Sequence, residues 1–176
     1  AYNVKANLSI QNAEKLTFPD NTFQHVNCQG VVHHTPNTEK SIYEIYRVLD
    51  KSGTASISVY YKNIFLKLWP YFNWIGHIIN LFGGGLKGRG RENIFLIKDP
   101  NEIVRLYDGS KNPIGKCYSK NEFKKILEKY FFIEEVYLHF FPARSLPFKI
   151  PKKIHSWLDR KLGFMIYFNL KKKCVE

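Results

Sequence analysis

The sequence predicts an α/β fold built on a mixed sheet, and three observations lead to this prediction. Residues 23–60 follow the order strand, helix, strand at the length of a βαβ unit, which favours a parallel pair. Apolar and polar residues alternate from Thr54 to Tyr60, as in a half-buried strand. Two further apolar runs, 131–141 and 164–170, predict C-terminal strands, which we expect to pair antiparallel at one edge.

The elements of the first third each have a local signal. Ala6–Ala13 is expected to form a short strand, and Phe23–Val32 a second one. Thr38 is a suitable N-cap for a helix whose apolar residues recur at helical spacing, namely Ile42, Ile45, Tyr46 and Leu49. We expect a turn at 50–53 before the strand that begins at Thr54.

An unusual segment, residues 63–93, interrupts this pattern. It is apolar as far as Phe82 and then glycine-rich and basic through Gly90. Lys67, Asn73 and Pro70 argue against a bilayer span. We expect an amphipathic hairpin or lid that covers a pocket or lies on a membrane surface, with the glycine-rich part as a flexible basic loop.

Three helices are predicted beyond this segment. Asp99-Pro100 marks the start of a short helix, and Ser119 with Glu122 forms a capping box that starts a second. The apolar face of the second consists of Phe123, Ile126, Leu127 and Tyr130. Pro151 opens the last helix, which Gly163 ends.

The composition limits the class of protein. The chain has 176 residues and three scattered cysteines without CxxC spacing, which excludes a disulfide scaffold and favours a reducing compartment. No basic and apolar leader begins at Ala1, so we expect a cytoplasmic protein that is peripheral if it meets a membrane. The net charge is +12, of which +4 falls in 62–99 and +7 in 142–176. This local excess indicates an anionic partner, the alternative being solvated surface lysines.

Four motifs follow one another in the first third of the chain. Residues 12–18 (NAEKLTF) match D-A-x-x-L-P-F, and 23–26 (FQHV) match F-D-x-V. Residues 32–34 (VHH) match L-H-H, and 44–53 (EIYRVLDKSG) match E-x-x-R-V-L-K-P-G-G. In this order the motifs resemble those of class I S-adenosylmethionine-dependent methyltransferases of the type 11 group. Asn12 and Gln24 each stand where the family has Asp, and residues 50–53 depart from K-P-G-G.

The resemblance implies a Rossmann-like class I methyltransferase sheet with S-adenosylmethionine as cofactor. It also implies methyl transfer to a small or lipid-linked acceptor. Asn12 and Ala13 would meet the adenine, since Asn keeps an acceptor oxygen. Gln29 and Gly30 would lie near the methionine part, because glycine lets a ligand approach the backbone, and His33 would line the pocket.

His34 is the candidate catalytic residue. It would act as a general base or shape the acceptor pocket, and a structural role under the following helix is the alternative. We expect no metal site, because Cys28 and the histidines have poor spacing and lack a fourth ligand.

The glycine-rich cofactor loop and the ribose-binding acid of the family have no counterpart before Asn12. We therefore expect a sheet that is incomplete at the N-terminus. Residues 1–61 would form a partial core, 62–118 an insert or lid with acceptor-side loops, and 119–176 the rest of the core with a basic tail. This chain alone is expected to be inactive and to bind the cofactor weakly, as a truncated form of a longer enzyme.

A second interpretation is a non-catalytic module that binds anionic membranes or polyanions through the insert and the tail. Nucleic acid is the less favoured polyanion, because no recognition motif is present. Association of the chain with itself as a homo-oligomer stays open.

Overall fold

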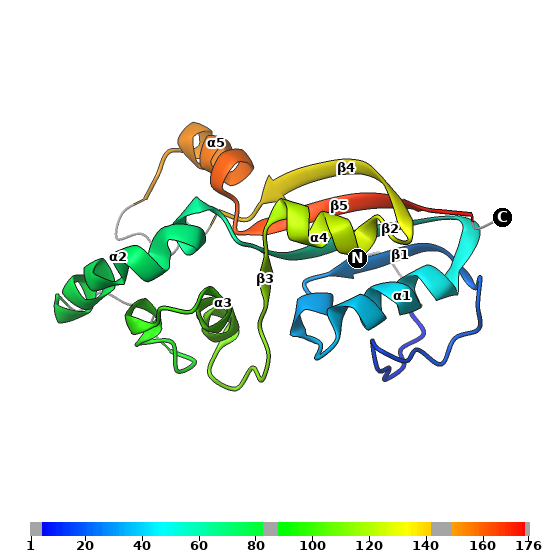
Figure 1. Ribbon diagram of the computed structural model, residues 1–176, viewed down its shortest axis with the longest axis horizontal. Coiled ribbons are helices and arrows are strands. Elements are labelled where there is room, and N and C mark those ends of the chain that lie inside the picture. The colour runs from blue at the N-terminus through cyan, green and yellow to red at the C-terminus, as the bar shows by residue number, and fades with distance from the viewer. Residues whose placement is uncertain (1–4, 83–87, 142–148, 175–176) are drawn as a thin grey trace.

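The structure is a computed structural model that describes residues 5–82, 88–141 and 149–174. Within these ranges a sheet of five strands forms the centre, in the order β1-β2-β5-β4 with β3 beside β2 (Figure 1). The strands are β1 (Phe23–Gln29), β2 (Leu49–Tyr61), β3 (Cys117–Tyr118), β4 (Phe131–His139) and β5 (Met165–Lys172).

Five α-helices and two 3-10 turns surround this sheet in the described part of the chain. They are η1 (Val32–His34), α1 (Thr38–Val48), α2 (Ile64–Leu81), η2 (Ile94–Leu96), α3 (Pro100–Asp108), α4 (Lys120–Leu127) and α5 (Lys152–Leu162). None of the helices in these ranges is long and apolar enough to pass through a lipid bilayer.

The pairing of the strands confirms the predicted mixed sheet. β1 and β2 are parallel, with Asn27 opposite Ser56 and Cys28 opposite Ile57. β5 runs antiparallel to both β2 and β4, so the C-terminal pair lies at one edge as expected. In the described ranges no strand pairs with the outer side of β1.

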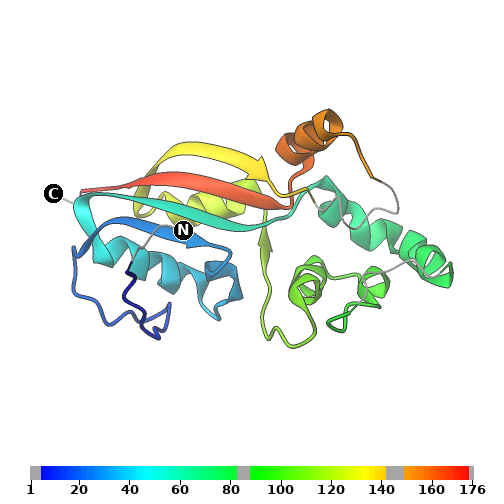
Figure 2. The ribbon, with the colours of Figure 1, turned by 180° about the vertical axis from the view of Figure 1, so that it is seen from behind.

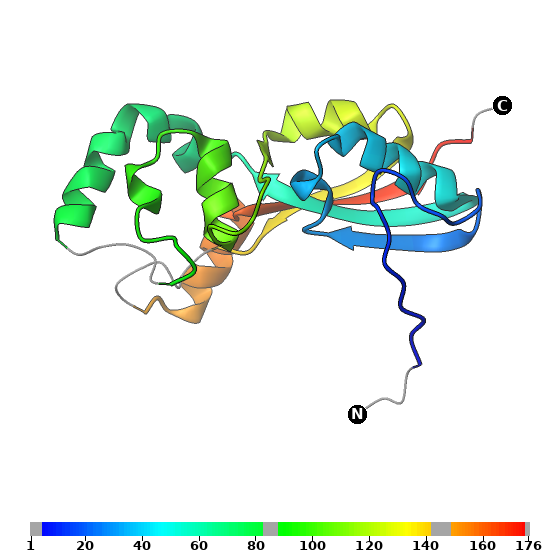
Figure 3. The same cartoon turned by 90° about the horizontal axis from the view of Figure 1, so that it is seen from below.

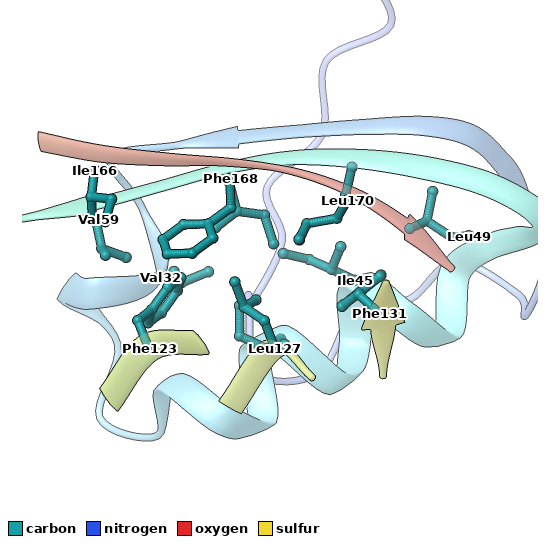
Figure 4. Packing of buried hydrophobic residues seen from close by; sticks show 13 residues of the cluster. Val32, Ile45, Leu49, Val59, Phe123, Leu127, Phe131, Ile166, Phe168 and Leu170 are labelled. Atoms are coloured by element: carbon teal, nitrogen blue, oxygen red, sulfur yellow. The ribbon is translucent and has the colours of Figure 1, made fainter. Parts of the chain in front are cut away.

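The main core lies between the sheet and two helices. α1 and α4 cover the same face of the sheet (Figure 3). The largest buried side chains interdigitate there, with Phe123 and Leu127 from α4 facing Phe168 of β5 (Figure 4). The capping box of Ser119 and Glu122 is present and starts α4 as predicted. The apolar face of α4 packs on the sheet.

Three local expectations were wrong. Ala6–Ala13 forms no strand, because no described strand lies beside it to take up its hydrogen bonds, and Leu8 and Ile10 are fully exposed. Asn37 rather than Thr38 caps α1, accepting a hydrogen bond from the amide of Lys40. Residues 50–53 belong to β2 instead of a turn, with a register irregularity opposite 23–25.

The E-x-x-R pair on α1 holds the preceding loop. Arg47 makes a two-point contact with Glu44, at 2.9 Å for both Nε–Oε1 and Nη2–Oε2. The same guanidinium donates to the carbonyls of Leu16 and Phe18 and to Asp20 Oδ1. Glu44 Oε2 accepts from the amide of Leu16 at 2.7 Å. This cluster fixes residues 16–20 on the outside of α1.

The insert folds as one long helix, α2, with η2 packed on it; residues 83–87 of the glycine-rich loop lie outside the described ranges. Trp69 Nε1 donates to the carbonyl of Ile97 at 2.8 Å, and Asn73 Nδ2 donates to that of Phe95 at 3.2 Å. A side chain at Gly76 would place its Cβ 1.9 Å from the Phe95 carbonyl oxygen. The close approach of η2 to α2 therefore requires glycine at this position.

Gly76→Ala should destabilise the protein in spite of the higher helix propensity of alanine. Relief of the clash must push η2 away from α2 and break the Asn73 bond, at a cost of about 1–3 kcal/mol. Urea unfolding followed by circular dichroism measures the change. Ser156→Ala on the exposed side of α5 is the control, and an alanine variant at 76 as stable as the native chain would contradict the packing.

Candidate functional site

The carboxyl ends of β1 and β2 meet at Gly30. Gly30 has a positive φ of 72°, and a Cβ there would meet no atom within 4 Å. Its amide donates to the backbone carbonyl of Ser58 at 3.2 Å and to Ser58 Oγ at 3.1 Å. The backbone is therefore held in place with one side open. In open α/β sheets this edge is where ligands bind.

His33 lies directly beyond this strand end, in η1. Its side chain is 1% exposed, and its ring centroid lies 4.6 Å from that of Tyr60 and 4.1 Å from that of His34. Neither ring nitrogen has a hydrogen-bond partner within the described ranges. Burial, with a smaller effect from His34, lowers the pKa of His33 to about 3. The imidazole is therefore neutral, with two unsatisfied polar atoms.

His34 is held between two hydrogen-bond acceptors. Its Nδ1 lies 2.6 Å from the carbonyl oxygen of Ile114, and its Nε2 lies 3.2 Å from Asp108 Oδ2. A carbonyl and a carboxylate both accept, so we assign a proton to each ring nitrogen. The hydrogen bond to Asp108 raises the pKa of His34 above its usual value. The protonated form of His34 is therefore favoured and its ring is held in place, with Asn112 Nδ2 also 3.1 Å from its Nδ1.

Tyr60 completes this group from the end of β2. Its hydroxyl donates to Asp108 Oδ1 at 2.7 Å. Burial raises the pKa of Asp108, but the hydrogen bonds from His34 and Tyr60 outweigh it, so the net shift is downward. Burial, followed by Asp108, raises the pKa of the Tyr60 phenol. At neutral pH Asp108 is ionised and Tyr60 carries its proton.

Aromatic and apolar side chains wall this group on the side of α2 and α3. The ring of Tyr60 lies 5.1 Å from that of Phe164, which lies 4.9 Å from that of Tyr107. The buried cluster consists of Tyr60, Leu66, Val104, Cys117 and Phe164. The wall covers one side of the group, while the His34 and Asp108 side chains remain 26% and 37% exposed.

The other predicted site residues lie elsewhere. Asn12 is exposed, and its Oδ1 accepts from the amide of Glu14 in its own turn. The Glu14 carboxylate accepts from the amide of Asn37, which places Asn12 and Ala13 near the start of α1. Gln29 is exposed at the end of β1. The structure therefore brings Gly30, His33 and His34 together and places the adenine pair on the adjoining loop.

Tyr60 and Asp108 were not predicted as site residues. Tyr60 was only one position of an alternating strand, and Asp108 was not singled out. Two unpartnered histidines after a strand end are the signal that could have prompted a search for a carboxylate partner. No local pattern connects Asp108 with His34, because the contact depends on how α3 packs.

Neither cysteine near the site is a reactive nucleophile. Burial raises the pKa of both Cys28 and Cys117 to about 11, so both are thiols at neutral pH. No three His, Cys, Asp or Glu side chains gather as metal ligands in the part of the chain that the structure describes.

Comparison with known proteins relates the first third to methyltransferases. The family described as "Methyltransferase domain" matches residues 2–57. The ubiquinone/menaquinone biosynthesis C-methyltransferase UbiE of Hydrogenovibrio crunogenus is 41% identical over 54 residues, which cover 31% of this chain and 21% of that protein. The chain thus matches only about a fifth of this curated relative.

The fold of the whole chain agrees with this match. An S-adenosylmethionine-dependent methyltransferase from Methanosarcina mazei superposes with a TM-score of 0.56 at 18% identity, covering 98% of this chain and 69% of that one. One from Thermotoga maritima gives 0.54 at 15% identity, covering 92% and 61%. Residues 2–57 are thus similar in sequence to a methyltransferase domain, and the fold of the chain is similar to that of solved S-adenosylmethionine-dependent methyltransferases.

Proposed function

We propose that the strand-end site at Gly30 and His33 serves S-adenosylmethionine-dependent methyl transfer to a small or lipid-linked acceptor. The observation that carries the proposal is the pair of unsatisfied nitrogens on buried His33, beside the open backbone of Gly30. An unsatisfied buried polar group costs about 1–3 kcal/mol, which a hydrogen-bonding ligand would recover. The residues therefore fit a polar ligand at this edge.

The parts of the site have distinct roles in this proposal. Gly30 lets the methionine end of the cofactor approach, and His33 would offer it a hydrogen-bonding nitrogen once the rings of His34 and Tyr60 that cover it shift. When bound, S-adenosylmethionine supplies an electrophilic methyl group. Transfer from a sulfonium needs mainly positioning in a dry pocket, and the rings of Tyr60, Tyr107 and Phe164 provide a dry wall.

The catalytic role of His34 stays a prediction, but its geometry favours one form of it. Both of its N–H bonds point at acceptors, so it is poorly suited to act as a general base. We propose that His34 stabilises the ionised Asp108, which in turn orients the Tyr60 hydroxyl at the acceptor side. The protein would act in the cytoplasm, where its free cysteines remain reduced.

We expect this chain to bind S-adenosylhomocysteine weakly, and His33→Phe to weaken binding further. Residues 5–22 contain no glycine, and their two acids, Glu14 and Asp20, bond to Asn37 and Arg47 instead. A hydrogen bond to a charged group contributes about 1.5–3 kcal/mol, so the lack of two such contacts lowers affinity by a factor of hundreds or more. Calorimetric titration of the native chain and the variant measures both effects.

His25→Phe is the matched control, because it makes the same change at an exposed position on β1. Circular dichroism checks that each variant is folded. A low-micromolar dissociation constant that His33→Phe leaves unchanged would overturn the assignment of the site. A second candidate function, a binding module for anionic membranes, rests on α2 and is compatible with the first.

A further inference from the structure

The polarity of α2 differs from that of an ordinary surface helix. Its packed side carries Asn73, Gly76 and Asn80, and Asn73 bonds to the backbone beneath it. Leu66 at its start packs into the cluster that contains Tyr60. Surface helices normally turn their apolar stripe inward. Here the inward side mixes Leu66 and Trp69 with Asn73 and Asn80, and many of the large apolar residues face out instead.

The outward side of α2 carries a continuous apolar stripe. Its members recur at alternating spacings of four and three residues and are 37% (Ile75) to 87% (Phe82) exposed. The stripe consists of Ile64, Leu68, Tyr71, Ile75, Ile78 and Phe82. Phe65, Phe72 and Trp74 are also exposed and widen it. Apolar patches of this size on a protein surface usually mark a binding face.

The helix that carries this stripe has a cation and no acid. Ile64–Leu81 contains Lys67 and no Asp or Glu. α5 lies at the same end of the molecule, beyond the end of the sheet (Figures 1 and 2). It exposes Ile154 and Trp157 next to its cations, which are Lys152, Lys153, Arg160 and Lys161.

The only acid of α5 points toward the body of the protein. Asp159 is buried, accepts from the amide of Phe141 at 2.7 Å and pairs with His139 at the end of β4. Its charge is thus used to dock α5 on the sheet. The outward side of α5 therefore combines apolar, positively charged and uncharged polar residues without an acid, like that of α2.

We propose that α2 and α5 form an interfacial docking surface for an anionic lipid bilayer, with α2 lying in the plane of the interface. Exposed aromatic and aliphatic side chains bordered by lysines are the features that such helices use. α2 does not enter the bilayer fully, because Trp69 and Asn73 tie its other side to 95–97.

A second copy of the chain fits this surface less well. Two copies would bring the cations of α2 and α5 together, with no acid on α2 to pair with them. The exposed apolar stripe of α2, with the residues that widen it, is also broader than the narrow strip of side chains that two packed helices bury between them. An anionic bilayer is complementary to both the width and the charge.

α2 connects the docking surface with the proposed active site. Leu66, on the inward side of α2, packs in the same buried cluster as Tyr60 and Phe164. The docking stripe lies on the opposite side of the helix, so docking does not rest on the proposed function.

Vesicle co-sedimentation tests docking without the cofactor. The probes are vesicles of phosphatidylcholine alone and of phosphatidylcholine with phosphatidylglycerol at roughly 7:3, whose negative surface attracts basic residues. We expect binding to the anionic vesicles that high salt weakens, and little binding to the neutral ones. Equal, negligible sedimentation with both would overturn the proposal.

Two double variants separate the apolar and charged contributions. Tyr71→Ser with Ile78→Ser should abolish most binding, and Lys153→Glu with Lys161→Glu should lower the partition coefficient at least about tenfold, since each cation contributes roughly fivefold. Lys120→Glu with Lys125→Glu on α4 is the control and should change little. Unfolding curves confirm that each variant is folded.

Sedimentation velocity provides the remaining decisive outcome. A dimer that dissociates in the Tyr71→Ser, Ile78→Ser variant would assign the stripe to a second copy and overturn the membrane proposal. A monomer whose vesicle binding depends on both sets of residues supports it, whether or not cofactor titration supports methyl transfer.

Discussion

Acidification from pH 7 toward pH 3 is expected to destabilise the fold by roughly 4 kcal/mol through His33 alone. The folded pKa of His33 is about 3, well below its ordinary value, because the ring is buried. The unfolded chain takes up this proton near pH 6.5, and the folded chain does not until about pH 3. Stability is therefore present above pH 6.5 and is lost as the pH falls between these values.

The groups that face His33 modify this loss in opposite ways. The raised pKa of His34 gives stability that is complete below about pH 6.5 and is lost as the pH rises through its folded pKa. Asp108 has a lowered pKa and loses its contribution in acid, as His33 does. The stability of the fold is therefore highest near the ordinary pKa of histidine. Its loss at lower pH is determined mainly by His33.

Urea unfolding at a series of pH values measures this dependence. His33→Phe should flatten the acid limb by about 1.4 kcal/mol per pH unit, the effect of one proton. Nuclear magnetic resonance of the native His33 ring gives an independent reading in case the variant folds poorly. A ring that titrates near pH 6.5, or a variant with the native slope, would contradict the burial of His33.

Arg47→Ala is expected to cost about 3–5 kcal/mol, because it leaves a buried carboxylate without its partner. Glu44 is 8% exposed, and its pKa is lowered chiefly by the hydrogen bond from Arg47. The same change releases the carbonyls of Leu16 and Phe18 and frees the loop at 16–20. Arg47→Lys should recover only part of the loss, since a lysine cannot make the two-point contact.

Lys124→Ala is the matched control for Arg47→Ala. Lys124 pairs with Glu128 on the surface of α4, where both side chains are more than 40% exposed. Removal of such a pair changes stability by at most about 1 kcal/mol. Equal losses for the two variants, measured as free energies of unfolding, would mean that the E-x-x-R cluster has no special structural role.

Local chemistry made most of the fold predictable. The capping box at Ser119, Pro100 at the start of α3 and the alternation in residues 54–60 act over a few residues, and all three elements appear. The wrong predictions depend on tertiary partners. Ala6–Ala13 has strand-like residues but no described strand to pair with, and residues 50–53 form an irregular stretch of β2 between its pairs with β1 at Leu49 and Thr54.

The site was predictable only in part, for a similar reason. The break at Gly30 and the histidine pair are visible in the sequence because they stand directly after a strand. Their partners, Tyr60 and Asp108, come from other elements, and only packing brings them to His34. The polar residues on the inward side of α2 were also not anticipated, because the carbonyls that they meet belong to 95–97.

One measurement tests the central claim most directly, namely that the cofactor binds at the ends of β1 and β2. The amide resonances of the native chain are followed by nuclear magnetic resonance during titration with S-adenosylhomocysteine, a method suited to weak binding. If the cofactor binds at the ends of β1 and β2, we expect graded, saturable shifts of the amide resonances centred on Gly30, His33 and His34, with much smaller shifts along α2 and α5. Shifts confined to other surfaces, or none at concentrations that saturate a weak site, would contradict it.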